Sequence, residues 1–328
     1  MKKNAMLMSV LLASSIFAAS SALAAPIVLK VGHDSPETVP VAKGLAYFSD
    51  LVKERTKGEV EIQVFNNGTV GSASDYAVNC QLGTLDIGAV NQSVMTSFFS
   101  DIEAIDIPYL ITSYEQADKL FANDGPLTKY YTDEINNAGI NLVNLDIWEV
   151  GFREFSNSVK AINTADDIAG IRLRVLDSKV HQGFWKALGA DPVPMSWGEA
   201  YTALQQKAID GVENAISVLE GNNINEVNSH LALTDHNYSA IFIIMSAQSM
   251  AKLSPEQQEI VKTAAKEAGV FQREEQRRQA KAAIDKLTSK GMALTTPDKA
   301  SIETKVASFL DEQKAKYPEI IKIVDANK

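Results

Sequence analysis

The sequence predicts an α/β protein of two lobes with one long helix that runs across both. Three observations predict this architecture. Strand-like and helix-like segments alternate from Pro26 to Val90, the alternation restarts after Gly139, and residues 254–290 form one uninterrupted helical stretch. The chain is also longer than a single hydrophobic core usually supports, so a division into two lobes is expected.

The first 24 residues are predicted to be a secretory signal peptide. Lys2 and Lys3 form a positive start, residues 5–19 are mostly apolar, and an Ala-Leu-Ala cleavage site ends at Ala24. The apolar run is shorter than the roughly 18–20 residues that a membrane anchor needs. We therefore expect cleavage after Ala24, export to the periplasm, and a mature chain of about 304 residues.

The composition narrows the classes of partner. The formal net charge is −10, and it becomes −12 when Lys2 and Lys3 are removed. Such an acidic chain is a poor candidate for binding nucleic acid or anionic membrane surfaces. Cys80 is the only cysteine, so no intrachain disulfide is possible, and we expect this residue to be a small buried apolar side chain.

The first lobe is predicted to contain a parallel sheet covered by helices. Strands are expected at Pro26–His33, Glu59–Phe65 and Leu85–Val90, because the second alternates strictly and the third is a short apolar run. One helix with apolar residues at helical spacing ends near Gly58, and a second ends near Leu82. The order β-α-β-α-β predicts a doubly wound arrangement.

A second series of elements follows without a Pro- or Gly-rich linker. We expect strands at Gly139–Trp148 and Gly170–Val175, a helix at Lys179–Leu188, a turn into a short strand at Asp191–Met195, a helix at Gly198–Ala208, and a turn at "DGVEN". Because no flexible linker separates the two series, strands are expected to pass directly between the lobes and to form a hinge.

The long helix has clear start and stop signals. Ser254 is a suitable N-cap, Pro255 takes the first helical position, and Gln257 completes a capping box. No strong breaker occurs before Lys290-Gly291. A helix approaching 37 residues is too long for one small lobe, so we expect it to run across both.

The sequence lacks the motifs of common enzymes. It has no G-x-S-x-G nucleophile elbow and no phosphate-binding P-loop. Its four histidines are scattered, with no H-E-x-x-H or C-x-x-C pattern, so neither a metal site nor a cofactor is predicted. These absences argue against an enzyme but do not exclude one.

Two arginines alternate with apolar residues in "GIRLRV". If this segment is a strand, Arg172 and Arg174 share one face. Arg174 lies nearer the carboxyl end of the strand, where doubly wound sheets bind ligands. Its guanidinium group matches a carboxylate in a bidentate geometry, so Arg174 is a candidate anion ligand. The alternative is a structural ion pair.

Other candidate residues also follow predicted strands. Arg153 comes after the strand that ends at Trp148, Trp197 and Glu199 come after the short strand at 191–195, and Asn214 lies in "DGVEN". Each of the last three has a structural alternative. Trp197 is equally suited to the core, Glu199 to the first turn of a helix, and Asn214 to a turn.

Several of these segments together resemble a known family. "GIRLRV" and "ALGADPVPMSWGEAYTALQQKAIDGVENAI" are similar to the signature of the DctP-type periplasmic solute-binding subunits of TRAP transporters. "VGHDSPETVPVAKGLAYFSDLVKERTKGEVEIQVF" and "IDIPYL" resemble the N-terminal lobe of that family. The resemblance implies a two-lobed periplasmic-binding-protein fold of the venus-flytrap kind. Lobe I is expected to comprise residues 25–150 and 240–279, and lobe II residues 151–239 and 280–328.

The resemblance also implies a set of ligand-binding residues. The carboxylate-binding arginine of the family corresponds to Arg174, a second ligand arginine to Arg153, the asparagine of the D-G-x-E-N motif to Asn214, and a solute-stacking aromatic residue to Trp197. Glu199 is commonly nearby. The matching positions of the first lobe are His33, Glu37, Asp75, Asn91 and Gln92.

The expected function is capture of a small organic acid in the periplasm by a monomer, and its delivery to the membrane subunits of a TRAP permease. Glu149 in "WEVGFR" and the polar first-lobe positions can meet hydroxyl groups, whereas those positions offer no lysine or arginine for a second carboxylate. A sugar acid such as a uronate, aldonate or keto-sugar acid is therefore expected. The alternatives are a C4-dicarboxylate or other monocarboxylate, or a solute sensor for a signalling receptor.

Overall fold

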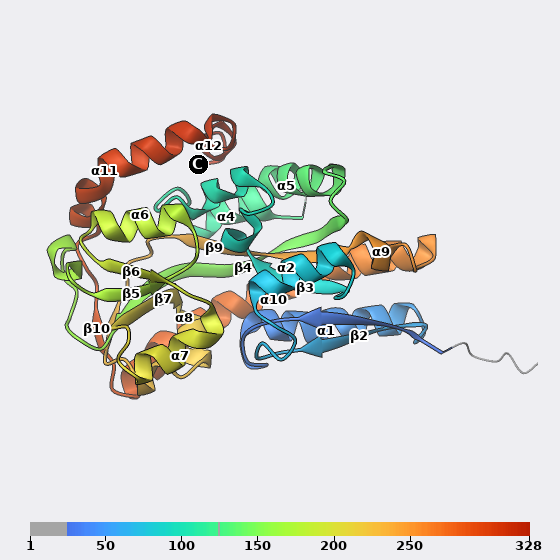
Figure 1. The fold of residues 1–328 in the computed structure, drawn as a ribbon, viewed down its shortest axis with the longest axis horizontal. Helices are drawn as coiled ribbons and strands as arrows, with labels where there is room; N and C mark the ends of the chain where they lie inside the picture. The colour runs from blue at the N-terminus through green and yellow to red at the C-terminus, as the bar shows by residue number, and fades with distance from the viewer. Residues whose placement is uncertain (1–24, 124) are drawn as a thin grey trace, which may run out of the picture.

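The computed structural model describes residues 25–123 and 125–328. The predicted signal peptide, residues 1–24, lies outside the described residues. Two α/β lobes lie side by side, with the first strands and helices in one lobe and β5–β7 in the other (Figure 1). No helix in the described part of the chain is long and apolar enough to cross a membrane.

The first lobe contains the predicted parallel strands. β1 (Ile27–Gly32) pairs in parallel with β2 (Val60–Phe65) and β3 (Ile87–Asn91). Helices α1 (Pro40–Arg55) and α2 (Ala73–Leu82) connect these strands, which confirms the β-α-β-α-β order. β3 also pairs antiparallel with β9 (Tyr238–Ser246), which returns to this lobe from much later in the chain. Cys80 of α2 is buried and unpaired, as predicted.

β4 is a single strand that belongs to both lobes. It spans Leu142–Asn157 and so continues beyond the predicted end at Trp148. Residues 142–152 pair antiparallel with β9, and residues 153–157 pair antiparallel with β7 (Gly211–Ala215). An irregular register between Glu149 and Gly151 marks the crossing, and Gly151 has a φ of 100°. A strand therefore passes directly from one lobe to the other.

The second lobe is built on β5 (Arg172–Val175), which pairs in parallel with both β6 (Asp191–Pro194) and β7. Helices α6 (Lys179–Ala187) and α7 (Trp197–Gln205) form as predicted. The prediction of a turn at "DGVEN" is wrong, because β7 is a fully buried strand between β4 and β5.

Helix α10 (Pro255–Ser289) is the predicted long helix. Ser254 Oγ accepts a hydrogen bond from the Gln257 amide at 3.2 Å, and Gln257 Oε1 accepts one from the Ser254 amide at 3.0 Å, which confirms the capping box. The helix packs on α1 and β4 with its first part and on α8 (Ile216–Gly221) with its later part. It therefore contacts both lobes.

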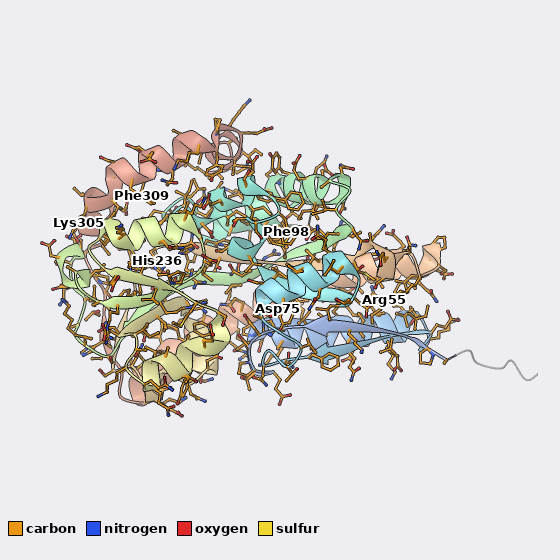
Figure 2. All side chains as sticks on the ribbon, viewed as in Figure 1. Arg55, Asp75, Phe98, His236, Lys305 and Phe309 are labelled. Atoms are coloured by element: carbon orange, nitrogen blue, oxygen red, sulfur yellow. The ribbon has the colours of Figure 1, made fainter. Side chains whose placement is uncertain are left out.

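The C-terminal helices α11 and α12 lie on the side of the molecule away from α1 and β2 (Figure 1). α11 (Lys299–Lys316) packs on α6, where Phe309, labelled in Figure 2, lies so close to Gly183 that a Cβ added there would be 2.6 Å from the ring. α12 (Pro318–Asp325) packs on α5 (Pro126–Asn137) and η1 (Ser100–Asp106). α12 thus covers first-lobe elements, whereas the sequence-based expectation placed residues 280–328 in lobe II.

The remaining elements are short. They are α3 (Gln92–Met95), α4 (Tyr114–Phe121), η2 (Ala165–Ile168), η3 (Ile224–Glu226), β8 (His230–Ala232), α9 (Ala247–Met250) and β10 (Ala293–Thr295).

Candidate ligand-binding site

A cavity of about 60 Å³ lies between the lobes, next to the crossing of β4. It is lined from the segment after β1, the ends of β3 and β5, the start of α7, and single positions of β7 and α10. This location agrees with the rule that α/β sheets bind ligands at the carboxyl ends of their strands. Six of the predicted site residues line the cavity: Arg174, Arg153, Asn214, Trp197, His33 and Asn91.

Arg174 is a buried cation with an unused donor. Its Nε and Nη2 atoms both donate to the Met195 carbonyl, at 2.9 and 2.7 Å, whereas Nη1 has no partner. The guanidinium carbon lies 5.4 Å from the centre of the Trp197 ring. Burial lowers the pKa of Arg174 to about 10, so the group still carries its charge at neutral pH. An anion in the cavity would meet this charge directly.

Arg172 has a different environment, although it lies on the same strand. Its side chain is 44% exposed, and it forms an ion pair with Asp210 at 2.7 Å. Its Nε also donates to Asp210 at 3.0 Å. The structural ion pair considered for these arginines therefore describes Arg172, while Arg174 faces the cavity.

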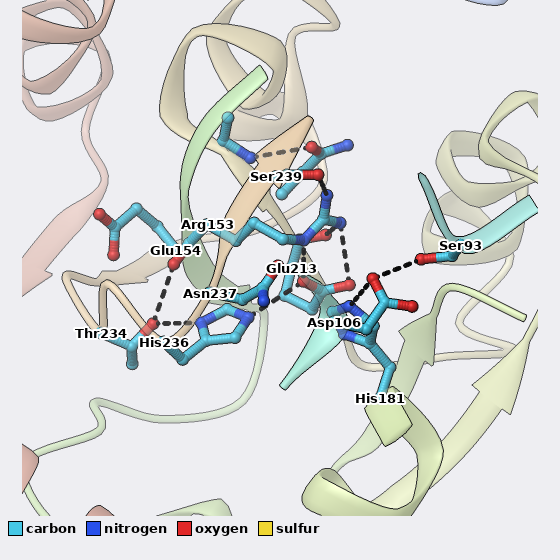
Figure 3. Close-up of polar contacts among 12 residues, drawn as sticks. Ser93, Asp106, Arg153, Glu154, His181, Glu213, Thr234, His236, Asn237 and Ser239 are labelled. Atoms are coloured by element: carbon cyan, nitrogen blue, oxygen red, sulfur yellow. Dashed lines mark hydrogen bonds and ion pairs between the residues drawn. The ribbon is translucent and has the colours of Figure 1, made fainter. Parts of the chain in front are cut away.

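The Arg153 side chain forms a buried ion pair with Glu213, as Figure 3 shows. The Nη2 atom donates to Glu213 Oε1 at 3.0 Å and to the Glu213 carbonyl at 2.8 Å, and Nε bonds Oε2. Burial alone raises the pKa of Glu213, but Arg153 and a bond from His236 outweigh it and hold that pKa well below its usual range. Since Glu213 neutralises Arg153, Arg174 is the one cavity-lining cation without a bonded carboxylate among the described residues.

Glu213 is itself part of a buried polar network with His236 and Thr234 (Figure 3). His236 Nε2 lies 3.1 Å from Glu213 Oε2, and His236 Nδ1 lies 2.8 Å from the Thr234 hydroxyl. Burial lowers the pKa of His236, so this ring is mostly neutral at pH 7. The network fixes the position of the Arg153 side chain.

The other lining residues differ in how many polar atoms they leave unused. Asn214 Oδ1 accepts from the Ala215 amide at 2.8 Å, which leaves the side-chain NH2 as a donor. Asn91 is occupied as the N-cap of α3, where Oδ1 accepts from Ser93 and Nδ2 donates to Ser239. His33 is 3% exposed, its Nδ1 has no partner, and burial lowers its pKa. Asn214 and His33 are therefore the better placed of these three for a ligand.

Three predicted carboxylates do not reach the cavity. Glu199 completes a capping box at the start of α7, with its carboxylate bonded to the Ser196 hydroxyl at 2.7 Å and the Ser196 amide at 3.2 Å. Asp75, labelled in Figure 2, does the same for Ser72 at the start of α2. Glu37 is exposed and lies outside the cavity lining. Helix capping explains the first two placements.

Glu149 and Gln92 are buried elsewhere. Glu149 bonds Arg277 Nη2 at 2.8 Å and the Tyr238 hydroxyl at 3.0 Å. Burial raises the pKa of Glu149 despite the opposing effect of Arg277. Gln92 donates to Asp106 at 3.0 Å and accepts from the Ala240 amide. Neither residue lines the cavity, because both side chains are used in tertiary contacts.

Several residues that line the cavity were not predicted from the sequence. Asp34 and Ser35 directly follow His33, so the rule about strand ends that selected His33 could also have selected them. Gln276 lies within the run "EEQRRQ" of α10, where no local signal distinguishes it from its neighbours. Apolar residues also form part of the wall, among them Val150 of β4, Val218 of α8, Ile241 of β9, and residues 39–41 at the start of α1.

The chain is similar in sequence to bacterial solute-binding proteins. The family model described as bacterial extracellular solute-binding protein, family 7 (DctP), matches residues 31–316. The 2,3-diketo-L-gulonate-binding periplasmic protein YiaO of Escherichia coli is 29% identical, covering 82% of this chain and 80% of that protein. The C4-dicarboxylate-binding periplasmic protein DctP of Rhodobacter capsulatus is 31% identical, covering 69% of this chain and 67% of that protein.

The fold of this chain is also similar to that of a solved structure. The sugar acid binding protein DctPAm of Advenella mimigardefordensis, in complex with galactonate, superimposes with a TM-score of 0.87 at 28% identity. The match covers 92% of this chain and 98% of that chain. The chain therefore belongs to the DctP family of bacterial extracellular solute-binding proteins, the binding subunits of TRAP transporters, and is not an enzyme.

Proposed function

We propose that this protein binds a small sugar acid in the cavity between its lobes, with the solute carboxylate on Arg174, and delivers it to the TRAP permease. The observation that carries this proposal is the unpartnered Nη1 of a charged arginine that is only 2% exposed. A buried polar group without a partner costs about 1–3 kcal/mol, and more when it is charged. A solute carboxylate would remove that cost.

The other lining groups favour a hydroxylated acid with one carboxylate. Glu213 already neutralises Arg153, and Asp34 adds a carboxylate to the lining, so a second solute carboxylate would lack a cation. His33 Nδ1, the Asn214 amide and the Gln276 amide are instead suited to hydroxyl or carbonyl oxygens. The ligands named for YiaO and DctPAm, a diketogulonate and galactonate, belong to this class. The C4-dicarboxylate of the Rhodobacter relative is the alternative.

Exported as a monomer after cleavage at Ala24, the protein would work in the periplasm by closing its lobes over the solute. The proposed lobes are residues 25–150, 240–279 and α12 on one side, and residues 151–239 with 280–317 on the other. The passage of β4 between them and the contacts of α10 with both support a hinge at this crossing.

A thermal-shift screen followed by calorimetry tests the solute class. The probes are galactonate, erythronate, glucuronate and galacturonate, with succinate and malate as dicarboxylates. We expect a sugar acid to raise the melting temperature in a concentration-dependent way and the dicarboxylates to have little effect. If succinate or malate binds tightly and the sugar acids do not, the proposed solute class is wrong. If no acid binds, the proposed function is wrong.

A further inference from the structure

Gln276 lies on α10 at the point where this helix passes the cavity. Its side chain is 1% exposed and forms part of the cavity wall. The Nε2 atom has no hydrogen-bond partner, and a Cβ added at Gly151 would lie 2.8 Å from it. A residue that lines the cavity therefore carries a buried, unsatisfied NH2 group beside the β4 crossing.

The oxygen of the same amide is held by lobe II. The Ser217 hydroxyl, on α8, donates to Gln276 Oε1 at 2.9 Å, and both side chains are buried. Since Ser217 uses one lone pair of this oxygen and Nε2 has no partner, the main unused capacity of the Gln276 side chain is the donation of hydrogen bonds.

Two neighbouring polar side chains of α10 are already satisfied. Gln272, one turn earlier, accepts from the Glu149 amide at 3.0 Å and donates to the Glu149 carbonyl at 2.6 Å. Arg277 bonds both Glu149 and Asp118, at 2.8 and 2.7 Å. These two residues attach α10 to the first lobe, and neither lines the cavity. Gln276 is the one of the three with an unused donor.

We propose that Gln276 binds the solute directly, donating a hydrogen bond from its side-chain NH2 group to a solute oxygen. Three lining residues from three elements then each carry a buried atom without a partner: His33 Nδ1 after β1, Arg174 Nη1 on β5 and Gln276 Nε2 on α10. A solute that bonds all three connects the long helix to both lobes. This inference rests on the proposed function, since it requires an organic acid in this cavity.

Two substitutions test the contact by calorimetry with galactonate, glucuronate and succinate as probes. Gln276→Glu keeps the oxygen that Ser217 needs and replaces the NH2 group by an anionic oxygen. We expect at least tenfold weaker binding of the acid at pH 7.5, with recovery at lower pH as the new carboxyl group becomes a donor. Gln276→Met removes the donor without adding charge, and we expect about five- to thirtyfold weaker binding.

Gln272→Met is the matched control, because Gln272 is an equally buried glutamine of the same helix that lies outside the cavity lining. It should lower the melting temperature, while the folded fraction keeps its affinity within about threefold. Unchanged affinity in both Gln276 variants would overturn the inference, as would an equal loss in Gln272→Met. If Arg174→Ala abolishes binding while the Gln276 variants bind normally, the inference alone fails. If the unmodified protein binds none of the probe acids, the proposed function fails with it.

Discussion

Replacement of Arg174 by alanine is the most direct test of the proposed site. The substitution removes a charge buried at 2% exposure, together with the Nη1 donor that faces the cavity. Because Nε and Nη2 are bonded to the Met195 carbonyl, a solute carboxylate would use Nη1 and the second hydrogen of Nη2. Each charge-assisted hydrogen bond of this kind is worth about 1.5–3 kcal/mol.

The expected loss follows from these two bonds. Truncating one partner of a buried, hydrogen-bonded charge pair costs about 2–5 kcal/mol, which corresponds to roughly 30- to 4,000-fold weaker binding. Arg174→Lys should also bind at least about tenfold more weakly, since an ammonium group cannot hold the Met195 carbonyl and both carboxylate oxygens in one plane. Isothermal titration calorimetry with the tightest acid from the screen measures both values.

Arg172→Ala is the control for this experiment. Arg172 lies two residues away on the same strand, but it pairs with Asp210 at the surface and lies outside the cavity lining. Such exposed pairs contribute little to stability, and we expect no change in affinity. Affinity within about threefold of the unmodified protein for Arg174→Ala, or an equal loss for Arg172→Ala, would refute the assignment.

Three further substitutions test the surroundings of the site and the core. Glu213→Gln leaves Arg153 as an uncompensated buried cation, so the free energy of unfolding in urea should fall by about 3–5 kcal/mol; a fall below about 1 kcal/mol would contradict the buried pairing. Glu199→Ala removes the N3 member of the capping box while the N-cap Ser196 remains, so stability should fall by less than the about 0.5–2 kcal/mol of a lost N-cap and solute affinity should not change; a tenfold weaker affinity would return Glu199 to the site. Burial raises the pKa of Asp146 from 3.8 to about 7, so the folded state binds this proton more tightly than the unfolded state, and stability falls as the pH rises from about 4 to 7. Asp146→Asn should therefore raise the free energy of unfolding by about 2–4 kcal/mol at pH 8 but not at pH 4, and equal effects at both pH values would exclude this explanation.

Elements with local signals could be predicted from the sequence, whereas β7 could not. The capping box at Ser254 and the strict alternation in β2 depend on residues close together in the chain. Around β7, Asp210-Gly211 and Glu213-Asn214 have the composition of a turn. Residues 211–215 nevertheless form a buried strand, in which Glu213 pairs with Arg153, 60 residues earlier in the chain. That compensation is a tertiary contact, and no local pattern indicates it.

The residues of the candidate site also differ in whether local sequence signals could predict their positions. Arg174 could be predicted because side-chain alternation and strand polarity both place it at the binding edge. Glu149 lies close to the same edge along the chain, but it pairs with Arg277, 128 residues later. The position of Gln276 depends on how α10 is rotated against β4, which its sequence periodicity leaves open.

The continuity of β4 restricts how the two lobes can move. Its backbone pairs with β9 as far as Phe152 and with β7 from Arg153 onward. Sliding of one lobe along the other would break these ladders together, whereas bending at the irregular pairing between Glu149 and Gly151 would disturb only a few pairs next to it. Rotation of the lobes about this short segment is therefore the motion that we expect to cost the least free energy. Val150 lies at the pivot and Arg153 close to it, and both line the cavity, so a solute bound there would lie next to the axis, where a small rotation would displace it little while the far ends of the lobes would travel furthest.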